Sequence, residues 1–515
     1  MNRSLLLRRA SLVLCLHACA SLATAQTPAG DSLQRGYHLL YSGERAAAVA
    51  HFEALLKRRP DDLSLRCGWL VAQRERLDDP TLRTEYEAAL DALIAAAEQR
   101  HESNADDDEA LFYLANGYLL RAGYRVEHDQ GMLAAARDGK HSKTHIEAYL
   151  KRHPENGDAY FALGMYNYYV DVAPTFVHFL RFLLFLPAGD RVEGLRQLER
   201  TAAQGRLLGP LARTMLMEIY ARLEGRGADA RAMGESLRLE YPGNDEIALQ
   251  LAGIYTGPLF EDRVRAAALY EGVIARHRDE LTPERAATRA NALLGLAAVK
   301  QEEWRIEEAI ATLTPTIDAK VVTPDWVLPQ FLIRRSNYRM LLDDPRAAAD
   351  AQRVLDDPTL GRWHDGARTM LDTIKQRRAS GEAAAYAALI PGNQLVVAGR
   401  WSEALHAYES VRARYPESPI VRYRFAYLDF ARGRTEAALP VFTALATGGR
   451  SVPEAIRAQA LLQVGRIHDL AGRRDEAKRA YQRVIDDFGK QRPAFAARVG
   501  LITPYRRPAA TPAAR

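Results

Sequence analysis

The stretch Gly399–Pro416, which reads GRWSEALHAYESVRARYP, decides the fold. Its glycine, alanine, aromatic and valine residues stand at fixed offsets from one another, and the same offsets recur in three other places along the chain. Recurrence of such a pattern with a period of about 34 residues indicates a repeat architecture. The four copies are Gly43, Ala48, Phe52 and Leu55; Gly399, Ala404, Tyr408 and Val411; Gly433, Ala438, Phe442 and Leu445; and Gly472, Ala477, Tyr481 and Val484.

Each position of the repeat has a physical reason. A small residue on a first helix lets a second helix approach closely where it presents its alanine. The aromatic residue one turn later fills the gap between successive helix pairs. Glycine supplies the left-handed turn between the two helices, and a proline such as Pro60 or Pro416 ends the second helix. The small residues of the first helices are Gly36, Gly392, Ala426 and Gly465.

These stretches resemble tetratricopeptide repeats, whose pattern combines a small residue, a glycine turn, Ala-x3-aromatic and a terminal proline. The resemblance is specific in the N-terminal copy and in the last third of the chain. Between them the helical periodicity continues in a degenerate form, and no alternating pattern of strands interrupts it. The resemblance implies an all-α fold, a right-handed superhelical solenoid of antiparallel helix pairs.

The chain divides into segments along this solenoid. One pair departs from the repeat because Tyr169–Asp190 inserts a long segment between its two helices. The last residues are rich in proline, alanine and arginine, a composition typical of disorder. The predicted segments are a signal peptide (1–25), N-terminal repeat-like helices (26–140), a pair with the insertion (141–205), degenerate helices (206–380), C-terminal repeats (381–500) and a disordered tail (501–515).

The N-terminus predicts export. Positive charge at Arg3, Arg8 and Arg9 precedes an apolar run and then Ala23–Ala25, which is typical of a secretory signal peptide. We therefore expect a periplasmic protein cleaved after residue 25. An alternative is lipidation at Cys19, which would make the chain a lipid-anchored subunit of an outer-membrane assembly complex, and only this alternative involves a membrane.

Charge argues against nucleic acid as a partner. The formal net charge is +5, and loss of the three signal arginines would lower it to +2. Arginine alternates with acidic residues on the helical segments, whereas nucleic-acid binders concentrate their positive charge. The lone mature cysteine, Cys67, is expected to be a small buried hydrophobic residue.

In tetratricopeptide repeats the first helix of each pair lines the concave face, so the residues one and four positions after the small residue should point inward. Tyrosine suits such a wall because it buries area and keeps a hydroxyl for hydrogen bonds. We therefore predict a scaffold that holds an extended peptide or helix of a cell-envelope protein. The predicted groove residues are Met165, Tyr168, Tyr169, Asn393, Tyr423, Tyr427, Phe430 and Arg466.

Signals for catalysis are weak. There is no Gly-x-Ser-x-Gly elbow and no phosphate-binding loop, so no catalytic residue, metal or other cofactor is predicted. The enzyme alternative is a metal site at His141 and His145, which lie at i and i+4 but lack the intervening glutamate of a His-Glu-x-x-His site. A solvated helix face is the simpler interpretation. The sequence does not indicate an oligomeric state.

Overall fold

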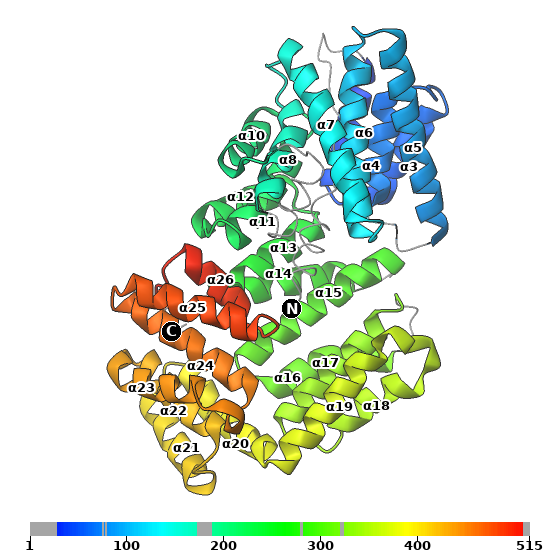
Figure 1. The fold of residues 1–515 in the computed structure, drawn as a ribbon. Coiled ribbons are helices and arrows are strands. Elements are labelled where there is room, and N and C mark those ends of the chain that lie inside the picture. The colour runs from blue at the N-terminus through cyan, green and yellow to red at the C-terminus, as the bar shows by residue number, and fades with distance from the viewer. Residues whose placement is uncertain are drawn as a thin grey trace. The chain divides into compact units, whose positions relative to one another are not determined.

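The structure is a computed structural model that describes residues 28–74, 77, 80–172, 188–278, 282–319 and 324–507. Across these ranges the chain forms helices and no strand, which confirms the all-α, tetratricopeptide-like solenoid (Figure 1). The described residues form two compact units. The N-terminal unit holds residues 28–220 and 228–247, and the C-terminal unit holds 221–227 and 248–507.

Helices of the N-terminal unit follow one another as packed pairs, with the two members of a pair adjacent in sequence. The pairs are α2 (Pro28–Tyr41) with α3 (Arg45–Leu56), α4 (Leu63–Gln73) with α5 (Pro80–Ser103), α6 (Asp108–Glu127) with α7 (Met132–Arg152), and α8 (Ala159–Asp171) with α10 (Arg191–Gln204). Most residues of α11 (Gly209–Arg222) and α12 (Gly227–Glu240) also belong to this unit.

The C-terminal unit continues the same arrangement. Its helices are α13 (Asp245–Tyr255), most of which belongs here, α14 (Arg263–Arg276), α15 (Pro283–Glu302), α16 (Ile306–Asp318), α17 (Val327–Leu341), α18 (Ala347–Asp356), the 3-10 helix η2 (Pro358–Trp363), α19 (His364–Ala379), α20 (Glu382–Val397), α21 (Trp401–Arg414), α22 (Pro419–Ala431), α23 (Thr435–Ala446), the 3-10 helix η3 (Gly449–Ser451), α24 (Glu454–Leu470), α25 (Arg474–Phe488) and α26 (Pro493–Ile502).

The predicted turn glycines adopt left-handed backbone angles. The φ angles of Gly43, Gly399, Gly433 and Gly472 are 83°, 71°, 87° and 73°. An L-residue meets steric resistance in this region, while glycine does not. Each of these glycines stands two residues before the second helix of its pair, so it reverses the chain between the two helices.

The predicted contact between small and aromatic residues is also present. A Cβ atom added to Gly36 would lie 2.3 Å from Cζ of Phe52, and one added to Gly68 on the next first helix would lie 2.5 Å from Cε1 of the same ring. The completely buried Phe52 ring is therefore held between two glycine backbones. The ring of Tyr481 lies in the same way against Gly465 and Gly500.

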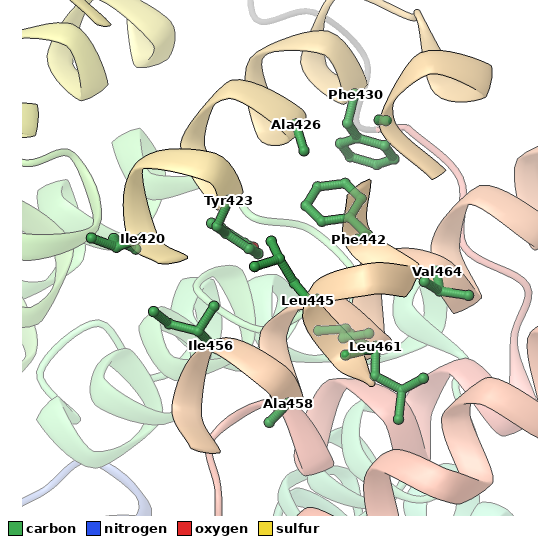
Figure 2. Packing of buried hydrophobic residues seen from close by; sticks show 14 of the residues in the cluster. Ile420, Tyr423, Ala426, Phe430, Phe442, Leu445, Ile456, Ala458, Leu461 and Val464 are labelled. Carbon is green, nitrogen blue, oxygen red and sulfur yellow. The ribbon is translucent and has the colours of Figure 1, made fainter. Parts of the chain in front are cut away.

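Apolar side chains of α22, α23 and α24 form the interior of the C-terminal repeats (Figure 2). The rings of Tyr423 and Phe442 lie 5.3 Å apart between α22 and α23. Ile420, Leu445 and Ile456 extend the same core and are each less than 4% exposed. Burial of large side chains of this kind is worth about 1.5–3 kcal/mol each, so these helices depend on one another for stability.

Two predicted boundaries differ from the structure. Helix α7 runs through residue 140, because its buried face continues without interruption from Ala135 to Tyr149. At the C-terminus α26 extends to Ile502, beyond the predicted start of the disordered tail at residue 501. The insertion between α8 and α10 lies largely outside the described residues. None of the helices within the described ranges is long and apolar enough to cross a bilayer.

Candidate peptide-binding face of the C-terminal repeats

Two predicted groove residues of the C-terminal repeats serve the packing between helices. Asn393 on α20 and Tyr423 on α22 are 2% and 3% exposed. Asn393 accepts a hydrogen bond from the hydroxyl of Tyr408 at 2.5 Å, and Tyr423 contacts Phe442. The spacing rule does not distinguish a side chain facing the groove from one facing the second helix of its own pair. The sequence prediction therefore included residues that the structure covers.

The other three predicted residues gather around a tyrosine from the C-terminal segment. Ring centroids of Tyr427 and Phe430 are 6.0 Å apart, and Phe430 lies 6.2 Å from the ring of Tyr505. The guanidinium carbon of Arg466 on α24 lies 4.5 Å from the centroid of the Tyr505 ring, within the range of a cation–π interaction. The sequence assigned Tyr505 to a disordered tail and missed its position here.

The tail is anchored by hydrogen bonds as well as by its ring. The backbone N–H of Tyr505 donates to Oδ2 of Asp469 at 2.8 Å. The guanidinium of Arg507 donates to the carbonyl oxygens of Phe430 and Ala431 at 2.9 and 3.1 Å. These carbonyls end α22, where the helix dipole favours a cation. Because Tyr427, Phe430, Arg466 and Asp469 contact or surround residues 503–507, we call these four residues the tail-binding face.

Asp469 fixes one side of this face. Its side chain is completely buried and accepts hydrogen bonds from Arg474 at 2.9 Å, from the Tyr481 hydroxyl at 2.8 Å, and from Tyr505. A buried carboxylate with several charge-assisted partners holds its position firmly. The same Tyr481 ring is held between two glycines, so the repeat sequence itself positions the acceptor for the tail.

Arg466 supplies the charge of the tail-binding face. Its side chain is 11% exposed and pairs with Glu261, from the α13–α14 loop, at 3.0 Å. Burial alone would lower the pKa of Arg466, but Glu261 and the neighbouring phenols more than offset this and raise its pKa. Burial raises the pKa of Tyr505 to about 12. The pair therefore presents a cation beside a neutral phenol at physiological pH.

A cavity of about 140 Å³ adjoins these groups. Its wall contains the aliphatic side chains of Leu259 and Leu462. The polar groups of Arg466, Tyr481 and Tyr505 also line it. Polar and apolar groups thus meet in a hollow beside the tail, as in many ligand sites, although this one is much smaller than a site for a drug-sized ligand.

Trp304, in the turn between α15 and α16, also contacts the C-terminal repeats and was not predicted to do so. Its ring lies 4.3 Å from the guanidinium carbon of Arg424 on α22 and is stacked at 6.4 Å on Tyr386 of α20. Its carbonyl oxygen accepts a hydrogen bond from Gln394 at 2.9 Å. The signal that could have identified it is a tryptophan at the position where other repeats carry glycine.

The predicted groove residues of the N-terminal unit lie on α8. Met165 and Tyr168 are 2% and 0% exposed, and Tyr169 is partly exposed with its ring 5.3 Å from that of Tyr168. The reason for the burial is a close helix contact, because a Cβ atom added to Gly194 of α10 would lie 2.5 Å from the backbone nitrogen of Tyr168. These residues belong to the N-terminal unit, whereas the tail-binding face belongs to the C-terminal unit. Cys67, also in the N-terminal unit, is buried, as predicted.

His141 and His145 flank a tyrosine. Tyr118 stacks on both rings, at 4.9 and 5.9 Å, and its hydroxyl donates to Glu98 at 2.5 Å. Burial lowers the pKa of His145, and His141 lowers it further. No group of three His, Cys, Asp or Glu side chains within the described ranges is placed to hold a metal ion. The geometry is that of an aromatic stack.

A second hollow, of about 530 Å³, lies in the N-terminal unit and was missed by the sequence analysis. Trp69 of α4 lines it and donates from Nε1 to Glu53 at 3.3 Å. Lys57 and Arg66 also line it and bring positive charge. No other segment of the described chain shows what this hollow would bind.

Family models settle the assignment of the repeats. One model of the tetratricopeptide repeat matches residues 33–79 and 392–455, and a second matches residues 459–490. These segments contain the four aligned copies, the pair α22–α23, and α3 with most of α2. The chain is a tetratricopeptide-repeat protein. Such repeats form protein-interaction scaffolds that are typically non-enzymatic and generally bind other proteins.

Solved structures similar to this tetratricopeptide-repeat protein include one from Parabacteroides merdae, also a tetratricopeptide repeat protein. It is 13% identical with a TM-score of 0.28, and 59% of this chain and 98% of that chain are covered. A monomeric IFIT1 mutant with Gppp-AAAA is 11% identical with a TM-score of 0.29 and 94% coverage of both chains. The tetratricopeptide domain of P58(IPK) is 14% identical with a TM-score of 0.18, covering 75% of this chain and 95% of that chain. No curated protein matches the chain.

Proposed function

We propose that this tetratricopeptide-repeat protein is an exported, non-enzymatic scaffold that binds an extended segment of a cell-envelope protein on the concave side of its C-terminal repeats. One observation carries the proposal. A short segment of the chain itself, residues 503–507, lies against Phe430 and Arg466 and is held there by ring, charge and main-chain contacts. These are the contacts with which a groove recognises a peptide.

The composition of the tail-binding face suits a binding site. Aromatic residues and arginine are enriched among the residues that dominate binding energy at protein interfaces. Tyr427, Phe430 and Arg466 lie together on two adjacent first helices, and Tyr427 remains partly exposed beside the tail. Rigid aromatic side chains on helices lose little conformational entropy when a peptide docks on them.

The location of the protein is part of the proposal and is supported by the N-terminal sequence. Arg3, Arg8 and Arg9 followed by an apolar run and a small-residue cleavage pattern favour export to the periplasm. Mass spectrometry of the mature N-terminus tests this point directly. A mature chain that begins at Gln26 supports a freely periplasmic protein, whereas one that begins at an acylated Cys19 supports the lipid-anchored alternative.

Peptide selection tests the binding function. A phage-displayed library is selected on the mature chain, and the affinity of the selected peptides is measured for wild type, Tyr427→Ala and Arg466→Ala. We expect each substitution to weaken binding by about tenfold or more, since central aromatic and arginine residues are typical hot spots. Arg479→Ala is the matched control, because this α25 side chain is 70% exposed and lies on the second helix of its pair.

The outcomes separate the hypotheses. Circular dichroism and urea unfolding first establish that each variant is folded. Selected peptides that bind all four proteins equally would place the binding site elsewhere on the chain, and the proposal would be wrong. The metal-enzyme alternative at His141 and His145 would need stoichiometric metal in the purified chain.

A further inference from the structure

We infer that residues 503–507 are an internal ligand of the tail-binding face, and that the partner segment shares their chemistry, an aromatic residue followed two positions later by a cation. This inference rests on the proposed function and deepens it. The segment reads Thr-Pro-Tyr-Arg-Arg. It follows α26 directly, and Thr503 has extended backbone angles of φ −115° and ψ 124°.

The aromatic position of the ligand is defined by two groups of different character. Phe430 lies 6.2 Å from the Tyr505 ring in a tilted arrangement, and the Arg466 guanidinium lies over the ring at 4.5 Å. A cation prefers the negatively polarised face of an aromatic ring, and this preference is strongest where both partners are shielded from water. The site therefore selects an aromatic side chain over an aliphatic one.

Asp469 holds the main chain of the ligand rather than its side chain. Oδ2 of Asp469 accepts from the backbone N–H of Tyr505 at 2.8 Å. Any residue except proline supplies this donor, so Asp469 fixes the register without restricting the sequence. Because Tyr481 and Arg474 also donate to Asp469, the acceptor is in place before a ligand arrives.

The cationic position is defined by the end of α22. Arg507 donates to the carbonyl oxygens of Phe430 and Ala431, and its guanidinium carbon lies 5.2 Å from the Phe430 ring. Carbonyl groups at the end of a helix and the face of an aromatic ring both favour positive charge. A peptide with glutamate at this position would meet both groups with the wrong sign. The face therefore discriminates against acidic segments.

The tail is held weakly enough to exchange. Arg506 and Arg507 are exposed, and Tyr505 is only partly buried, unlike the core rings of Tyr481 and Phe442. A segment tethered by a short linker has an effective concentration on the order of millimolar, so it excludes a weaker or dilute competitor without tight binding. A partner therefore binds only when its affinity and concentration are high enough to displace the tail.

A labelled copy of the tail tests the inference. The probe is a fluorescein-labelled, amidated peptide of residues 501–507, LITPYRR, and binding is measured by anisotropy on the full mature chain. We expect the probe to bind Tyr505→Ala about tenfold or more tightly than wild type, because the internal competitor has lost its ring. Arg507→Ala, which changes an exposed residue, should release the tail to a smaller extent and controls for a folding defect.

Three further measurements complete the experiment. Arg466→Ala introduced into Tyr505→Ala should abolish the gain, and a probe with alanine for Tyr505 or glutamate for Arg507 should not bind Tyr505→Ala. Tyr415→Ala, which changes a tyrosine at the end of α21, is the matched control and should behave as wild type. Circular dichroism and urea unfolding confirm that the variants are folded.

Two results would overturn the inference. Tight and equal binding of the probe to wild type and Tyr505→Ala would mean that the tail does not occupy the face in solution. Absence of probe binding to both Tyr505→Ala and Arg507→Ala would mean that the tail-binding face does not recognise the sequence of the tail. The proposed function is tested separately, with library-selected peptides and with substitutions in the repeats themselves, so its failure is distinguishable from the failure of this inference.

Discussion

Two kinds of turn occupy the same position in the repeats of the C-terminal unit. In the clear repeats the turn residue is glycine, and a Cβ atom added to Gly433 or Gly472 would meet no other atom within 4 Å. In the degenerate repeats Glu261 and Trp304 stand at this position, also two residues before the second helix, with φ angles of 50° and 62°. Both of these side chains contact helices that lie far along the chain.

The difference shows what the loss of a turn glycine achieves. A non-glycine residue in the left-handed region costs about 1–2 kcal/mol, so it persists where other interactions compensate. Trp304 stacks on Arg424 and Tyr386, and Glu261 pairs with Arg466. Glycine turns only reverse the chain, while the substituted turns also tie the first helices of the C-terminal repeats to α13–α16. Degeneracy of the repeat is therefore the source of specific tertiary contacts.

The largest predicted effect concerns a feature that both kinds of repeat share. Tyr408 in a clear repeat and Tyr270 in a degenerate one each lie on a glycine, with hypothetical Cβ distances of 2.4 Å to Gly392 and 2.3 Å to Gly295. We expect Tyr408→Ala and Tyr270→Ala each to lower the free energy of unfolding by about 3–5 kcal/mol, because each leaves a large cavity. Urea unfolding measures the loss.

The matching phenylalanine variants are the controls and should lose much less, since the ring remains. If Tyr270→Ala proved harmless while Tyr408→Ala did not, the degenerate repeats would be held together by some other contact, and the shared role of the aromatic ring would be wrong.

The next largest effect is expected at Trp304, where two variants separate the cost of the left-handed backbone from the contribution of the side-chain contacts. Trp304→Ala keeps the left-handed turn and removes the ring, so we expect a loss of about 2–3 kcal/mol from burial and the cation–π contact. Trp304→Gly removes the same ring but relieves the backbone, so the loss should be smaller by about 1 kcal/mol. Thermal and urea unfolding of the two variants give the difference. Equal stability of the two variants would show that the turn is not strained.

The sequence predicted the fold well because the repeat pattern is local. Gly43, Ala48 and Phe52 lie within a few turns of one another, and the physics of their spacing determines the helix pair. The copies in the last third of the chain predicted the turn glycines and the aromatic positions correctly, as the φ angles and the glycine contacts show. The predicted boundaries near α7 and α26 differ from the structure.

The candidate site was predicted less completely because it depends on distant contacts. Phe430 and Arg466 were identified from their place in the repeat, but their neighbours Glu261 and Tyr505 come from a degenerate turn and from a segment that composition assigns to disorder. Neither contact leaves a periodic signal in the sequence. A non-glycine residue at a glycine position and an isolated aromatic residue in a proline-rich tail are the local clues.

A third, smaller effect tests the glycine turns directly. Gly433→Ala should lower the free energy of unfolding by about 1–2 kcal/mol, because alanine is strained at a φ of 87° and meets no atom that could compensate. Gly366→Ala is the matched control, since Gly366 lies exposed in α19 without a positive φ and has room for a methyl group. There we expect a gain of about 0.4–1 kcal/mol from the lower entropy of the unfolded chain. A loss of similar size at both positions would mean that φ is not what distinguishes them.

The smallest effect is expected at Glu261, where strain and contact nearly balance. Glu261→Gly relieves a left-handed residue but removes the ion pair with Arg466, whose net contribution at a partly exposed site is about 1 kcal/mol or less. We therefore expect a change within about 1 kcal/mol in urea, and a smaller ion-pair contribution at high salt. Glu261→Ala, which keeps the strain, should be the less stable variant. A gain in stability with Glu261→Gly would show that relief of the left-handed backbone outweighs the ion pair, and the remaining role of the carboxylate would then be to orient Arg466 over the aromatic ring of the bound segment. Introduced into Tyr505→Ala, where the internal tail no longer competes, Glu261→Gly should weaken binding of the tail peptide even though it folds as well as wild type.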